Sequence, residues 1–212
     1  MTAPAPLRSA LALGGFVLLA TLLLAGVHAL TRERIEAGER DAERATLAVL
    51  LPPGHDNDPL ADRVALPDPA ALGLRAPRQA WIARRGVTPL GIVLPAVARD
   101  GYGGDIELLV GLTHEGRVVG VRVVAHRETP GLGDPIEAGR SNWIEHFAGR
   151  SLADPAPPRW TVRRDGGAFD QFAGATITPR AVVHAVRRAL EYHAAHRSVL
   201  YAAAPTPTGA GR

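Results

Sequence analysis

The sequence predicts an α+β protein: an N-terminal transmembrane helix, then a domain with a mostly antiparallel sheet and flanking helices. Three observations lead to this prediction. Residues 9–30 are apolar and uncharged, the strand-like segments are grouped mid-chain, and the clearest amphipathic helix lies near the C-terminus. With 212 residues, the chain is long enough for one domain plus an anchor.

The apolar segment, residues 9–30, follows a short arm, residues 1–8. As a helix rising about 1.5 Å per residue it extends roughly 33 Å, enough to cross the hydrocarbon core of a lipid bilayer. A cleaved signal peptide is the alternative, with Val27-His28-Ala29 as its cleavage pattern, but the segment is long for that purpose. We expect an uncleaved anchor. More arginines follow it than precede it, and this charge count favours a cytoplasmic domain.

The segment after the anchor, residues 31–54, is predicted to be a charged stalk helix. Thr31 is its expected cap, and Pro52-Pro53-Gly54 its expected end. Residues 55–78 are rich in Pro and Asp and are predicted to be an irregular connection.

Alternation of apolar residues predicts strands over 79–84, 91–97, 105–113 and 117–126, with a turn at 114–116 joining the last two. Residues 135–149 are predicted to form a helix that places Trp143 and Phe147 in the core, and 160–164 a further strand. The Pro-, Thr- and Gly-rich tail, residues 205–212, is expected to be disordered.

A final helix is predicted behind the turn Gly174-Ala175-Thr176, with Thr178 as N-cap and Pro179 at the first helical position. The free N–H groups and the dipole at such a junction suit a phosphate group. Thr176 offers a hydroxyl there, and Gly174 allows close approach of the backbone. The helix has an apolar face of Val182, Val183, Val186 and Leu190, and a polar face of Arg180, His184, Arg187, Arg188 and Glu191.

Composition excludes several classes of function. The chain has no cysteine, which excludes Cys-ligated iron–sulfur clusters, c-type haem attachment and thiol nucleophiles, so electron transfer would need an organic cofactor. Its net charge is +3, and the arginines are interleaved with acidic residues, so no nucleic-acid partner is expected. We find no catalytic constellation, no metal-ligand set and no Walker or Rossmann fingerprint in the sequence.

The string Asp170-Gln-Phe-Ala-Gly174-Ala175-Thr176-Ile-Thr-Pro resembles the flavinylation motif of the FMN-binding domain family. The closest resemblance is to the G subunits of Rnf (Rsx) ion-translocating electron-transport complexes. Two earlier strings, residues 101–105 (GYGGD) and 126–134 (HRETPGLGD), occur in the same order in that family. The likeness runs from the membrane segment to about residue 203.

This resemblance implies an FMN-binding domain over residues 55–204, with FMN joined by a phosphoester to Thr176 through a flavin transferase. It implies an electron relay without catalytic residues, placed among the other subunits of a membrane complex that couples electron transfer to ion translocation. It also implies a single-pass inner-membrane protein with a periplasmic domain, opposite to the charge count. Many members have Ser or Thr where this chain has Ala173.

Other residues of these strings receive less specific predictions. The loop 129–133, which contains Thr129, Gly131, Leu132 and Gly133, can fold against the flavin, with its glycines allowing backbone contact. Tyr102 can stack on the ring; an ordinary turn and a core residue are the alternatives. Asp170 can brace its loop or be recognised by the transferase.

Several histidines are also interpreted from the sequence. His126 and Glu128 are interpreted as a surface hydrogen-bonded pair. The three histidines of the last helix, His184, His193 and His196, are expected at the surface.

Three other functions remain open at this stage. One is the C subunit of a sodium-translocating NADH:quinone oxidoreductase, against which the short chain argues. The second is a membrane-anchored binding module without flavin, and the third is a stand-alone flavin reductase.

Overall fold

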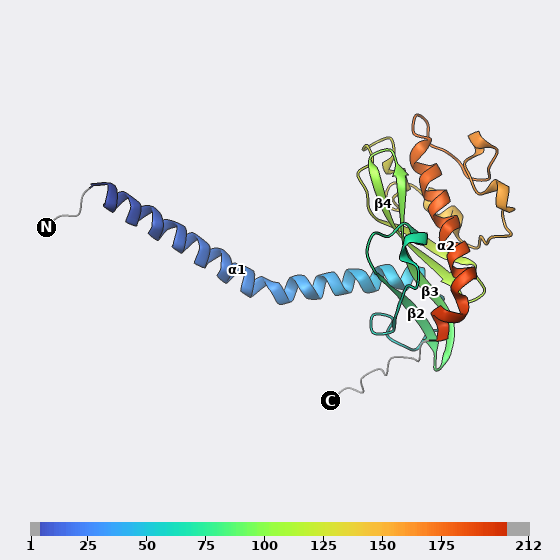
Figure 1. Ribbon diagram of the computed structural model, residues 1–212, viewed down its shortest axis with the longest axis horizontal. Helices are drawn as coiled ribbons and strands as arrows, with labels where there is room; N and C mark the ends of the chain where they lie inside the picture. The colour runs from blue at the N-terminus through green and yellow to red at the C-terminus, as the bar shows by residue number, and fades with distance from the viewer. Residues whose placement is uncertain (1–4, 203–212) are drawn as a thin grey trace. The chain divides into compact units, whose positions relative to one another are not determined.

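The computed structural model describes residues 5–202, so the predicted tail (205–212) and the first four residues of the predicted arm lie outside the described range. The chain divides into two compact units, one ending at Ala45 and one beginning at Thr46 (Figure 1). The second unit therefore starts inside the predicted stalk, ahead of residue 55.

Helix α1 runs without interruption from Ala5 to Leu50. It contains one candidate membrane span, Leu13–Arg32, and none of the residues in this span is buried. The predicted cap at Thr31 is wrong, because helix formation simply continues there. Its hydroxyl donates to the carbonyl of Val27 at 2.8 Å, as a hydroxyl inside a helix commonly does.

The last turn of α1 belongs to the second unit. Leu47, Leu50 and Leu51 are buried in a small cluster with Ala83 and Val93 of the sheet. The helix ends directly before Leu51, the residue that precedes Pro52, where proline disfavours helical backbone.

The sheet has five antiparallel strands in the order β1-β2-β3-β4-β5. The strands are β1 (Arg63–Ala65), β2 (Gln79–Arg85), β3 (Thr88–Gly101), β4 (Gly104–Thr113) and β5 (Val118–Ala125). The four predicted strands are confirmed, with β3 longer than expected. The irregular connection predicted over 55–78 is wrong in part, because it contains β1 and the 3₁₀ turn η1 (Pro69–Leu72).

Alternation along β3 separates two buried layers. Ile92, Leu94 and Ala96 join the main core, whereas Val93 points to the small cluster around Leu50. The predicted 114–116 turn, which joins β4 to β5, is confirmed. There the N–H of Thr113 donates to the carbonyl of Arg117 at 2.8 Å.

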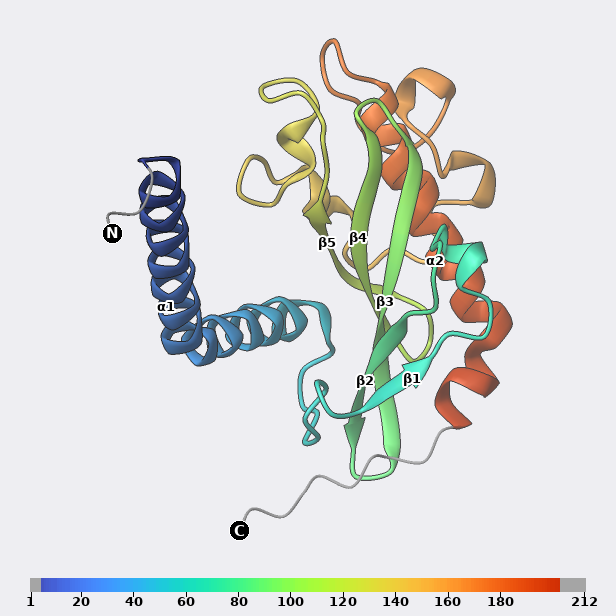
Figure 2. The same cartoon turned by 60° about the vertical axis from the view of Figure 1, so that its left-hand side comes forward.

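Helix α2 (Ile177–Ala202) covers the main-core face of the sheet and packs chiefly on β3 (Figure 2). The predicted apolar face is confirmed: Val182, Val183, Val186 and Leu190 are all buried. The expectation that His193 lies at the surface is wrong. Its side chain is completely buried, because it faces the β4–β5 turn at Gly116.

Residues 126–176 are largely irregular, and two predictions fail there. The expected helix over 135–149 is replaced by two short 3₁₀ turns, η2 (Asp134–Ile136) and η3 (Trp143–Phe147). Ser141 explains the break, because its hydroxyl donates to the Pro135 carbonyl and accepts the N–H of Trp143. The expected strand over 160–164 is reduced to a single bridge between Val162 and Phe169, followed by η5 (Arg163–Asp165).

An aromatic cluster supports these irregular segments. Phe147 stacks on Phe169 at a centroid distance of 4.7 Å and contacts Trp143 edge-on at 5.4 Å. Trp160, directly after η4 (Pro157–Arg159), packs against both phenylalanines. The predicted core positions of Trp143 and Phe147 are therefore confirmed, although neither residue lies on an α-helix.

Candidate functional site

A cavity of about 390 Å³ opens where three segments meet: the β3–β4 turn, the loop after β5 and the start of α2. Figure 2 shows these three segments at one end of the sheet. The cavity is lined by Tyr102, Glu128, Thr129, Leu132, Gly133, Gly174, Ala175, Thr176, Ile177 and Thr178.

The chain enters α2 through a tight turn. The N–H of Ala175 donates to the carbonyl of Phe172 at 3.2 Å, and Gly174 has φ = +80°, which glycine adopts without a steric penalty. Thr176 occupies the N-cap position, because its carbonyl accepts the first helical N–H, that of Arg180. The predicted cap at Thr178 and first position at Pro179 are therefore wrong by two residues.

The early start of α2 changes what the two threonines do. Thr176 is only half-buried, so its hydroxyl is accessible from the cavity, whereas Thr178 is buried and bonds to a carboxylate. Because the N–H groups of a first helical turn have no helical acceptor, those of Ile177 and Thr178 are available near the Thr176 hydroxyl. Such a junction accommodates an anion.

Glu128 ties the three segments together. Its carboxylate accepts the N–H of Gly103 at 2.8 Å and the hydroxyl of Thr178. The side chain is only 5 % exposed, so the prediction of a surface pair with His126 is wrong. His126 instead accepts the Glu128 N–H at Nδ1 (3.0 Å), which leaves the proton on Nε2 for Glu137 at 2.7 Å.

The opening of the cavity is apolar. Tyr102 is 72 % exposed, Leu132 48 % and Ile177 44 %. Three large apolar side chains around one opening form a surface on which a planar ring can pack.

Charged residues surround the Thr176 side of the cavity. Arg164 Nη1 donates to Thr176 Oγ1 at 3.5 Å. Arg180 forms a bidentate pair with Asp165 at 2.6 and 3.0 Å. This hydrogen bond from Arg180 holds the pKa of Asp165 below its ordinary value and raises that of Arg180. Both groups therefore stay charged at neutral pH.

Six of the residues predicted from the sequence line the cavity together: Tyr102, Thr129, Leu132, Gly174, Ala175 and Thr176. Gly131 lies in the same loop, where its N–H donates to Asp134 at 2.7 Å, but it does not line the cavity. Asp170 lies elsewhere. It pairs with Arg163 at 3.1 Å beside a smaller cavity of about 130 Å³. Its recognition by a transferase stays a prediction.

Four lining residues were not among the candidate site residues: Glu128, Gly133, Ile177 and Thr178, although Gly133 belongs to the loop 129–133 that was predicted to fold against the flavin. A signal existed for Gly133, which closes the Gly-rich string after β5. A Cβ there would lie 2.9 Å from Glu128 and 3.1 Å from the Thr178 hydroxyl, so only glycine fits. Glu128 had no comparable signal, because its partners come from distant parts of the chain.

Two family models match the chain. The model described as FMN-binding domain matches residues 101–191, and the RnfG N-terminal region matches residues 1–50. The curated relatives include the G subunit of the ion-translocating oxidoreductase complex of Pseudomonas aeruginosa, 53% identical over 197 residues, covering 92% of each chain. The proteins of the same name in Cereibacter sphaeroides and Vibrio cholerae are 47% and 43% identical, covering 94% and 92% of this chain, and 90% and 93% of their own lengths.

The chain belongs to the family of G subunits of ion-translocating oxidoreductase complexes. All ten cavity residues, from Tyr102 to Thr178, fall inside the matched FMN-binding domain. A cavity with an apolar opening beside an accessible helix start suits FMN, which combines a planar ring with a phosphate. The candidate span of α1 and the family together identify a membrane protein.

Proposed function

We propose that this chain is the flavoprotein electron relay of a membrane complex that couples electron transfer to ion translocation, with FMN joined by a phosphoester to Thr176. One observation supports the covalent link most strongly. The Thr176 hydroxyl is accessible from the cavity at the N-cap of α2, inside the segment that matches the FMN-binding domain. The chain lacks cysteine and contributes no redox group of its own.

Each part of the cavity has a task in this proposal. The first N–H groups of α2 and the Thr176 oxygen hold the phosphate, because both lie on the same side of the cavity. Tyr102, Leu132 and Ile177 contact the ring and shield it from water. FMN, when bound, supplies the electron-transfer chemistry. The Glu128 carboxylate keeps the Tyr102 turn and the start of α2 in position.

We also propose that the protein crosses the inner membrane once and places its domain in the periplasm, with the other subunits of its complex and a flavin transferase as partners. The resemblance to the family supports this orientation, although the distribution of arginines favours the opposite one.

The lack of cysteine allows this orientation to be tested by labelling a single introduced thiol. A single Cys at the exposed position Ala194→Cys should react with a membrane-impermeant thiol reagent in cells whose outer membrane is permeabilised. Labelling only after rupture of the inner membrane would place the domain in the cytoplasm.

Intact-mass and peptide mass spectrometry on protein purified from its native host tests the covalent link. We expect a gain of one FMN minus water on the peptide that contains Thr176, and no gain in Thr176→Ala. Thr129→Ala is the matched control, because it removes another threonine hydroxyl of the same cavity. An unmodified Thr176 peptide from a host that flavinylates other proteins would leave a membrane-anchored binding module as the better description.

A further inference from the structure

Three arginines lie around the turn that precedes α2, and two of them are neutralised. Arg163 pairs with Asp170 at 3.1 Å, and Arg180 pairs with Asp165 through two bonds. Arg164 forms no ion pair with any residue in the part of the chain that the structure describes. Its guanidinium instead reaches the Thr176 hydroxyl. Its charge is offset only in part, by the nearby Asp165 carboxylate that Arg180 binds, and it lies beside the proposed acceptor oxygen.

The backbone of Arg164 is fixed relative to this turn. Its N–H donates to the side-chain oxygen of Gln171 at 3.2 Å, which connects η5 to the loop that leads to Thr176. The chain reverses directly after η5 through Gly166 and Gly167. Gly166 has φ = +82°, and a Cβ on Gly167 would lie 1.8 Å from the Thr161 carbonyl oxygen. The contact between Arg164 and Thr176 is thus a consequence of how the loop folds.

We propose that Arg164 binds the phosphoryl group that Thr176 receives, an inference that rests on the proposed function. A phosphodiester on Thr176 carries a single negative charge, which the guanidinium of Arg164 would offset, since it forms no close ion pair within residues 5–202. At 3.5 Å from Oγ1 the guanidinium is at the long limit for a hydrogen bond, so the free hydroxyl gains little from it. Phosphoryl oxygens bonded to Oγ1 would offer the acceptors that an arginine fork binds in pairs.

The same placement assists attachment. With a flavin dinucleotide such as FAD as the donor, Thr176 Oγ1 would attack the FMN phosphorus, the bond from this phosphorus to the bridging oxygen would break, and AMP would leave. The hydroxyl proton passes to the transferase or to solvent. Arg164 orients the phosphoryl group for attack and offsets the negative charge that develops on its oxygens.

Attachment kinetics on the full-length chain test this role. Protein made in a host without the transferase is mixed with purified transferase and FAD, and the fraction carrying FMN is followed by intact mass. We expect Arg164→Gln to load about tenfold more slowly or worse, because a charge-assisted contact is lost. Arg164→Lys should recover part of the rate. Arg159→Gln, which removes the same charge from a neighbouring exposed turn, should load like the wild type.

A second readout reports on the attached group itself. The ³¹P resonance of the phosphodiester should shift in loaded Arg164→Gln but not in loaded Arg159→Gln. Wild-type loading and an unchanged resonance in Arg164→Gln would overturn the inference while leaving the proposed function intact. Equal slowing in both Gln variants, or no recovery with lysine, would also overturn it. A wild-type chain that takes no FMN on Thr176 would refute the proposed function, and the inference with it.

Discussion

The β3–β4 hairpin and residues 126–176 both contribute buried residues to the main core, but their backbones are held in place in very different ways. In the hairpin, backbone pairing runs from Gly91↔Thr113 to Gly101↔Gly104, and side chains alternate between two buried layers. Between 126 and 176 the backbone is mostly irregular, its backbone hydrogen bonds are mainly those of short turns and isolated bridges, and side chains add further connections. Examples are the Trp143 indole N–H, which donates to the Asp170 carbonyl at 2.8 Å, and the Glu128 carboxylate.

This difference indicates which parts of the chain can form a binding site. Regular strands satisfy their own backbone groups and leave few of them near a ligand, whereas loops on a rigid scaffold present both backbone and side-chain groups. Most of the cavity residues lie in irregular segments or turns, and the remainder open α2. To hold a cofactor in place, the irregular region must be as firmly packed as the sheet. Substitutions in the two regions test whether it is.

The largest effect is expected from Phe147→Ala, which removes a completely buried ring from the aromatic cluster. We expect a loss of about 3–5 kcal/mol in the free energy of unfolding. Leu108→Ala in β4 is the matched sheet variant, with an expected loss of about 2–5 kcal/mol. Denaturant unfolding followed by near- and far-ultraviolet circular dichroism measures both. If Phe147→Ala lost the near-ultraviolet signal but kept the far-ultraviolet signal, the irregular region would unfold separately from the sheet and would be the less stable of the two.

A smaller effect is expected from Glu128→Ala, which leaves the Gly103 N–H and the Thr178 hydroxyl without their acceptor. Because unpaired buried polar groups are costly, we expect a loss of about 2–3 kcal/mol in unfolding free energy. A double-mutant cycle with Thr178→Val should give a coupling of about 1–2 kcal/mol. Additive losses in the cycle would show that the Glu128–Thr178 bond does not stabilise the cavity end of the sheet.

The smallest effect concerns pH and the opposite end of α2. Burial, helped by Arg197 and His114, lowers the pKa of His193 to about 4. The unfolded chain takes up this proton near pH 6.5, whereas the folded chain resists it until about pH 4, so stability is lost as pH falls through that window. We expect a loss of about 2 kcal/mol between pH 6.5 and 4.5 from this residue.

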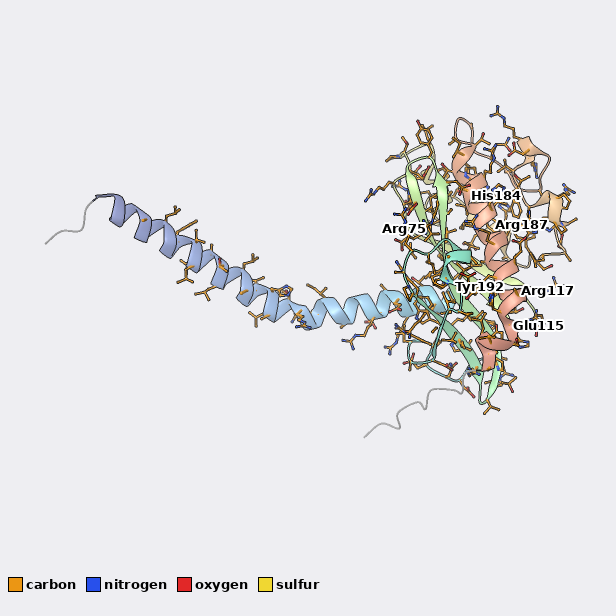
Figure 3. All side chains as sticks on the ribbon, viewed as in Figure 1. Arg75, Glu115, Arg117, His184, Arg187 and Tyr192 are labelled. Carbon is orange, nitrogen blue, oxygen red and sulfur yellow. The ribbon has the colours of Figure 1, made fainter. Side chains whose placement is uncertain are left out.

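His193→Gln isolates that contribution. Its unfolding free energy should depend less steeply on pH than that of the wild type between pH 6.5 and 4.5. Figure 3 shows Glu115 and Arg117 beside the C-terminal half of α2; in the sequence they flank Gly116, which lies against the His193 ring. Equal slopes for the two proteins would mean that His193 takes up its proton as readily in the folded chain as in the unfolded chain.

The sequence predicted the parts of the fold whose patterns are local. The alternation of β2 to β5, the 114–116 turn and the apolar face of α2 each depend on residues close together in the chain. It failed where a strand depends on a partner outside its own segment, as in β1, whose Val64 pairs with Ala80. It also failed where local side-chain hydrogen bonds override the apolar spacing, as at Ser141, which breaks a segment whose spacing is otherwise helical.

The site follows the same rule. The turn before α2 and the glycine-rich loop were recognisable as strings of residues, and six of their predicted residues line one cavity. Glu128 and Thr178 were not recognised, because they are separated by fifty positions and meet only in the folded chain. The exact first residue of α2 also depended on this contact, since Thr178 turns inward to Glu128 rather than capping the helix.

The way α1 ends determines where the chain can be cut. An added Cβ at Gly111 of β4 would lie only 1.9 Å from the Leu50 carbonyl oxygen, so the helix end rests directly on the middle of the sheet. A soluble fragment that begins at His55, after the apparent stalk, would expose Ala83 and Val93 to water and lose the leucines that cover them. A fragment that begins before Thr46 keeps the leucines that cover Ala83 and Val93. It can therefore be separated from the membrane span without exposing this face of the sheet to water.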